Sequence, residues 1–236
     1  MNKEMEERLA KANTLREEEK YGDSAKEYTE ALLDCVKLSD FEGMVHALGG
    51  MSLVFKHQIG KGESEIFKRL TLAYAHESYK VAEENKDKVN PYILSIAYRV
   101  YGDGLLMSGK TEESLKYFED SLATTPADRC EKGNLKAHIG GIKYKLGQKE
   151  QGLKEIREAL ADIRTGNMSQ YAPRVWETGC LNKLAIASVF DGKKEEALAL
   201  INESIEIAKT HNLSIRLREA EEILEKINTG RTDFGV

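Results

Sequence analysis

The side chains that could support catalysis are scattered along this sequence without a catalytic spacing. Its 5 histidines lie at positions 46, 57, 76, 138 and 211, and none forms an HExxH motif or a pair four residues apart. Metal ligands on a helix need such spacing because two of them must share one face. The sequence also has no GxSxG, no P-loop and no GxGxxG after a strand. We therefore predict no enzyme activity, no metal and no cofactor.

The cysteines indicate a reducing compartment. Cys35, Cys130 and Cys180 are odd in number, widely spaced and without a CxxC or Cys/His ligand pattern, so we expect free thiols that fill the core. The first residues contain no apolar signal region, and no later stretch approaches the roughly 20 apolar residues of a membrane span. These features predict a cytoplasmic protein without a membrane contact.

Composition favours long amphipathic helices. Charged residues make up 32% of the 236 residues and hydrophobic residues 41%, with only 3 prolines and 7% aromatics. The net charge is -5, from 35 Lys and Arg against 40 Asp and Glu, and no basic run occurs. Because phosphate binding needs clustered positive charge, we do not expect a nucleic-acid partner.

An aromatic, glycine and apolar spacing recurs along the chain. Its most regular copy is Tyr98, Tyr101, Gly102, Leu105, Gly109, Ser114, Phe118, Ser121 and Pro126. This series resembles the tetratricopeptide repeat (TPR), in which large and small side chains let two antiparallel helices interlock. The turn glycines 109, 147 and 192 lie 38 and 45 residues apart, rather than the 34 of the standard repeat. Such lengthened repeats resemble those of kinesin light chains, bacterial peptide-pheromone sensors and cell-polarity adaptors.

The resemblance implies an all-α fold: a right-handed α-α superhelix of about five helical hairpins plus a C-terminal capping helix. We expect one repeat domain over 1–228 and a flexible tail over 229–236. Ser39-Asp40 and Asn90 are expected to cap helices, and Pro126 to begin one. The first hairpin should turn at Gly22-Asp23, and Gly60-Lys61-Gly62 should end the helix that starts at 41. No repeat position accounts for Gly104.

In TPR arrays the first helix of each hairpin, helix A, lines the concave face that meets a ligand. The resemblance therefore implies a protein or peptide partner and a mixed polar groove. Its expected residues are Asn13, Arg16, His46, Arg99, Asp103, His138, Asn182 and Lys183. These residues do not reproduce the Lys and Asn arrangement with which chaperone-binding TPR proteins hold a terminal carboxylate.

Three functions stay open at this point. The leading one is a non-enzymatic adaptor that binds a protein or peptide segment. The second is a peptide-responsive signalling sensor, which would act in trans because the sequence has no helix-turn-helix output domain. The third is a self-assembling structural protein, in which an exposed helix face pairs two copies as a homodimer. The tyrosines in the middle of the chain are expected to be core, although a groove there would gain an aromatic anchor.

Overall fold

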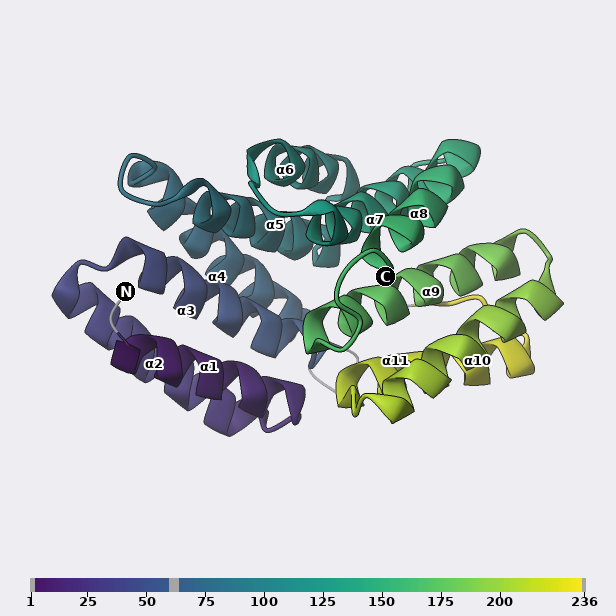
Figure 1. Ribbon diagram of the computed structural model, residues 1–236, viewed down its shortest axis with the longest axis horizontal. Helices are drawn as coiled ribbons and strands as arrows, with labels where there is room; N and C mark the ends of the chain where they lie inside the picture. Colours follow the sequence, from purple (N-terminus) through teal and green to yellow (C-terminus); the bar gives the residue numbers. More distant parts are fainter. Residues whose placement is uncertain (1–2, 60–63, 235–236) are drawn as a thin grey trace. The chain divides into compact units, whose positions relative to one another are not determined.

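The computed structural model describes residues 3–59 and 64–234, and all regular structure in these residues is α-helical (Figure 1). The predicted all-α class, with five hairpins and a final helix, is confirmed. The helices of the described residues are α1 Lys3–Glu17, α2 Tyr21–Leu38, α3 Phe41–Lys56, α4 Ser64–Glu84, α5 Pro91–Met107, α6 Thr111–Thr124, α7 Arg129–Lys145, α8 Lys149–Ile163, α9 Tyr171–Phe190, α10 Lys194–Thr210 and α11 Ser214–Thr229.

The contacts group these helices into two compact units, residues 1–126 and 127–236. In unit 1, α1 to α6 pack in chain order, so that each helix contacts the next. In unit 2, α7 to α11 pack in the same way. This nearest-neighbour packing is typical of repeat proteins. The expected single domain over 1–228 stays a prediction.

Several hairpins use the same turn geometry between their two helices. Gly109, Gly147 and Gly192 have φ of +79°, +88° and +72°, as predicted for the residues that reverse the chain. After Gly109, the Lys110 N–H donates to the Leu105 carbonyl at 2.9 Å, and the residues after the other two glycines bond in the same register. This bond satisfies a carbonyl at the helix end, and the left-handed backbone favours glycine there.

The turn between α1 and α2 uses the same geometry without glycine. Glu19 has φ of 58°, and the Lys20 N–H donates to the Leu15 carbonyl at 2.8 Å. The predicted turn at Gly22-Asp23 is wrong, because Gly22 already lies in the first turn of α2, where an added Cβ would meet no atom within 4 Å. The prediction relied on the glycine and therefore placed the turn three residues after Glu19, the residue that has the left-handed backbone.

Two predicted caps are confirmed and one helix start is wrong. The Gly43 N–H donates to the Asp40 side chain, and the Ile93 N–H donates to that of Asn90, both at 3.0 Å. Pro126 does not begin the next helix. The Asp128 side chain instead caps α7 by accepting from the Glu131 N–H at 2.9 Å. The predicted helix end at 60–62 lies outside the described residues.

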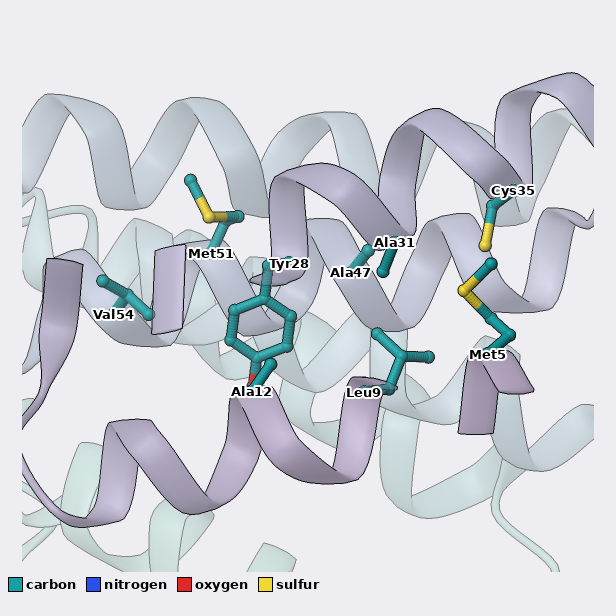
Figure 2. Packing of buried hydrophobic residues seen from close by; sticks show 9 residues of the cluster. All are labelled: Met5, Leu9, Ala12, Tyr28, Ala31, Cys35, Ala47, Met51 and Val54. Atoms are coloured by element: carbon teal, nitrogen blue, oxygen red, sulfur yellow. The ribbon is translucent and has the colours of Figure 1, made fainter. Parts of the chain in front are cut away.

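Tyr28 is the largest fully buried side chain of the first core cluster. Its ring points from α2 toward Ala12 of α1, and Met51 and Val54 of α3 belong to the same cluster (Figure 2). Gly50 of α3 lies directly against this ring, since a Cβ there would overlap Cε1 and Cζ of Tyr28. Gly50, the second of two adjacent glycines in α3, therefore makes room for a neighbouring aromatic ring.

The glycines of α5 allow two helices to approach it. A Cβ at Gly102 would lie 3.0 Å from the Phe118 ring of α6, as the repeat pattern requires. A Cβ at Gly104 would lie 2.9 Å from Cβ of Ala75 and 3.2 Å from Cα of Leu72, both on α4. Gly104 is thus explained by contact with the preceding hairpin, which a template built from one hairpin does not contain.

In unit 2 the backbones of α7 and α8 come into close contact where the two helices cross. A Cβ on Gly140 would lie 2.8 Å from the Gly152 carbonyl oxygen, and one on Gly152 would lie 2.5 Å from the Gly140 carbonyl oxygen. The two backbones therefore touch where both side chains are absent. Ile156 packs beside this contact and is 1% exposed.

Two buried carboxylates, each held by two cations, join the helices of unit 2. Asp162 contacts Arg129 Nε at 2.6 Å and Lys136 Nζ at 2.7 Å. Burial alone would raise the pKa of the Asp162 carboxyl, but the hydrogen bonds from Lys136 and Arg129 outweigh it and hold the pKa below its usual value. Glu177 binds Arg164 Nε at 2.8 Å and Arg174 Nη1 at 2.7 Å. These pairs link α7 to α8 and the loop after α8 to α9.

The expected tail over 229–236 is partly packed on unit 2. Thr229 completes α11, and Gly230 ends it with φ of +70°. The Phe234 ring then meets Phe190 edge-on, with centroids 5.8 Å apart, and the Lys226 Nζ donates to the Asp233 carbonyl at 2.7 Å. Residues 235–236 lie outside the described part of the chain.

Candidate binding surface

The first helices of the hairpins, the A helices, form the inner layer of each unit. In unit 1, α3 contacts both α1 and α5, and in unit 2, α9 contacts both α7 and α11. Among the described residues, the second helices α2, α4 and α6 share no comparable contacts with one another. Helices that lie closer together are on the inside of a curved stack, so the A helices are inner within each unit.

Asn13 and Arg16 of α1 form hydrogen bonds with a tyrosine of α2. The Asn13 Oδ1 accepts from the Tyr28 hydroxyl at 2.7 Å and from Arg16 Nη1 at 3.1 Å. Arg16 is buried, and it also binds the Tyr28 hydroxyl at 3.1 Å and Glu17 at 2.7 Å. Both side chains therefore satisfy the one polar atom of a buried tyrosine. The predicted groove residues Asn13 and Arg16 thus also have partners inside unit 1.

Asp103 of α5 is buried, with only 3% of its surface exposed. Its Oδ1 lies 2.8 Å from the Lys56 Nζ at the end of α3. The pair joins two successive A helices, so the expected exposed position of Asp103 is corrected to an interhelical one. Sequence spacing does not reveal this pair, because Lys56 and Asp103 belong to different hairpins.

His46 and Arg99 lie on the neighbouring A helices α3 and α5. Both side chains are half-buried. Burial lowers the pKa of His46; the Glu42 carboxylate opposes this, and the positive charge of Arg99 lowers the pKa further. This direction favours the neutral form of the His46 imidazole. Two of the predicted groove residues thus lie within electrostatic range of each other.

In unit 2 the three predicted residues differ in their surroundings. His138 is half-buried on α7. Lys183 of α9 lies across Gly141 of α7, since a Cβ at Gly141 would be 3.3 Å from the Lys183 Cδ, and its Nζ is 3.5 Å from the Gly179 carbonyl. Asn182 is buried and accepts from the Ser204 hydroxyl of α10 at 2.7 Å. Asn182 therefore faces α10 instead of the inner layer.

The thiols are placed in the core, as predicted. Burial raises the pKa of Cys35 to about 11 and that of Cys180 to about 12, and it also raises the pKa of Cys130. A thiol with a raised pKa is a poor nucleophile at neutral pH, because the thiolate is the reactive form. Within residues 3–59 and 64–234, no group of three or more His, Cys, Asp or Glu residues has the geometry of a metal site.

The central tyrosines pack between α4, α5 and α6. Tyr79 stacks on Tyr101 with centroids 4.9 Å apart, and Tyr117 meets both rings edge-on at 5.3 and 4.6 Å. Burial is the main cause that raises the pKa of Tyr79, to about 12, and that of Tyr98, whose hydroxyl donates to Glu83. This cluster joins an A helix to B helices, so it is a packing cluster of unit 1.

The architecture defines an all-α helical repeat protein, and no described helix is long and apolar enough to cross a membrane. No family model and no curated protein matches the sequence. Among solved structures, the chain is similar to the crystal structure of the apo form of RapI, with a TM-score of 0.58 and 14% sequence identity. The match covers 96% of this chain and 82% of RapI. At this identity the similarity establishes the fold alone.

Proposed function

We propose that the chain is a non-enzymatic, TPR-like adaptor that binds a protein or peptide segment on its A helices. The observation that carries this proposal is the inner layer of A helices in each unit. In TPR-like arrays such a layer presents side chains to an extended or helical ligand. The contacts of Gly102 with Phe118 and of Gly140 with Ile156 support the TPR assignment, because they place a small residue of helix A against a large one of helix B.

The residues proposed for ligand contact are fewer than the sequence predicts. His46, Arg99, His138 and Lys183 stay in the proposal because they are half-buried on A helices. A half-buried polar side chain keeps part of its surface accessible, so a ligand can form a hydrogen bond with it. Asn13, Arg16, Asp103 and Asn182 are proposed to shape the surface through their internal bonds.

Charge reversal tests the proposed surface. We expect the double variant Arg99→Glu/Lys183→Glu to lose the proteins that the wild-type chain captures from native lysate, as read by mass spectrometry. The melting temperature of Arg99→Glu alone should not fall, because Arg99 forms no ion pair in the described part of the chain. This single variant controls for the internal bond from Lys183 Nζ to the Gly179 carbonyl. Lys26→Glu/Lys154→Glu is the matched control, since both lysines are exposed on the B helices α2 and α8. Equal capture by wild-type and Arg99→Glu/Lys183→Glu proteins would refute the surface.

The second candidate is a peptide-responsive signalling sensor that acts in trans. It is favoured by the turn residues Gly109, Gly147 and Gly192, because their spacings of 38 and 45 residues indicate lengthened repeats. Lengthened repeats are a feature that the chain shares with the TPR-like peptide sensors. The two candidates differ in the ligand, because a sensor would bind a short free peptide and an adaptor a segment of a larger protein. The cytoplasmic location is part of both proposals.

A further inference from the structure

We infer that the α3–α5 face of unit 1 contains a subsite for an acidic side chain of the bound peptide, with Arg99 as its cation and His46 beside it. The inference rests on the proposed function and names the chemistry of one position in the ligand. It follows from the partners of the charged groups on this face.

The carboxylates along the seam between α3 and α5 already have partners. Glu42 Oε1 accepts from the backbone N–H of Asn90 at 2.9 Å and from its side-chain amide at 2.7 Å. Asp103 is paired with Lys56. Arg99 lies between these two acids along α5, and within the described residues no carboxylate or other acceptor bonds to it. Among the described residues, the seam therefore has one guanidinium that forms no ion pair.

This absence of a partner distinguishes Arg99 from the other arginines of similar burial. Each of the remaining described arginines that is not exposed forms an ion pair with Asp or Glu. These pairs are Arg8 with Glu30 and Asp34, Arg16 with Glu17, Arg174 with Glu177, Arg216 with Glu219 and Arg218 with Glu222. A partly desolvated guanidinium without a carboxylate is costly, so this position favours a carboxylate supplied from outside.

The chemistry of the two side chains fits a carboxylate. A guanidinium offers parallel N–H donors that match the two oxygens of a carboxylate. A neutral His46 can donate one further hydrogen bond without adding a second charge to the site. An Asp or Glu of the ligand would therefore gain a charge-assisted contact on α5 and a neutral contact on α3.

The test uses a library of random linear peptides displayed on phage and selected on the full-length protein. On wild-type protein we expect a related peptide set with Asp or Glu enriched at one position. On Arg99→Glu we expect Lys or Arg to replace the acid at that position, and on Arg99→Gln we expect no charge preference there. Lys26→Glu, which reverses an exposed charge on α2, should select the same acidic set as wild type. Circular dichroism verifies that each variant is folded.

A titration of one selected peptide completes the test. Replacing its acid with the matching amide should weaken binding to wild-type protein about tenfold, and binding to Arg99→Gln by much less. An acidic preference that is absent from the wild-type set, or that persists on Arg99→Glu, would overturn the subsite while the proposed function stands. If no related peptides are enriched on wild-type protein, the proposed function fails together with the subsite.

Discussion

Gly152→Ala is expected to lower the free energy of unfolding by about 3 kcal/mol, the upper part of the usual range for overpacking. The added Cβ would lie 2.5 Å from the Gly140 carbonyl oxygen and 2.7 Å from the Tyr144 backbone nitrogen. These are backbone atoms of α7, so no side-chain rotation can relieve the clash, and α7 and α8 must separate. The measurement is urea denaturation followed by far-ultraviolet circular dichroism.

Gly22→Ala is the matched control for this substitution. Gly22 also lies in a helix, but a Cβ there would meet no atom within 4 Å. Its replacement should therefore raise stability by about 0.5–1 kcal/mol through helix propensity alone. A Gly152→Ala protein as stable as the wild type would contradict the α7–α8 crossing.

Gly50→Ala is expected to destabilise the protein by about 2–3 kcal/mol, because the new methyl group would overlap the buried Tyr28 ring. Here the obstacle is a side chain, so the cost must depend on that side chain. Tyr28→Ala alone should cost about 3–5 kcal/mol. In the Tyr28→Ala background, however, Gly50→Ala should cost almost nothing, because the ring is gone. Urea denaturation of the four proteins measures this coupling.

The same four proteins provide the control for this second prediction and the outcome that would contradict it. If Gly50→Ala cost the same with and without the Tyr28 ring, the contact between α2 and α3 would not be the one described. A gain in stability from Gly50→Ala in the wild-type background would also contradict it, since helix propensity would then outweigh the clash.

Local patterns predicted much of the fold. The turn glycines 109, 147 and 192 and the caps Asp40 and Asn90 satisfy backbone groups within a few residues, so the sequence around them is sufficient to identify them. The α1–α2 turn was misplaced because Glu19 adopts a left-handed conformation that usually indicates glycine. Pro126 was misread because the cap at Asp128 is two residues further along.

The surface was harder to predict because its residues are distinguished by contacts between hairpins. A repeat template assigned Asn13, Arg16, Asp103 and Asn182 to A helices correctly, but it did not contain their partners. The partners Tyr28, Lys56 and Ser204 lie on other helices. Arg99 and His46 were predicted by the same template, which did not indicate that the charge of Arg99 acts on His46 from the next A helix.

Burial and bonding thus separate two kinds of polar residue on the A helices. One kind completes the interior, as Asp103 does with Lys56. The other, represented by Arg99, is half-buried and has no internal partner among the described residues. If the A helices bind a peptide, the second kind should determine which peptide is bound, because the first kind is already satisfied within the protein.

Hydrogen exchange of the full-length chain, with and without a peptide selected on it, tests the proposed binding surface most directly. Binding on the A helices predicts slower exchange of backbone amides in α3 and α5, with little change in the B helices α2 and α6. The peptide with its acid replaced by an amide serves as the weak-binding reference. Protection concentrated on α2 and α6, with α3 and α5 unchanged, would contradict the proposal that the A helices bind the ligand.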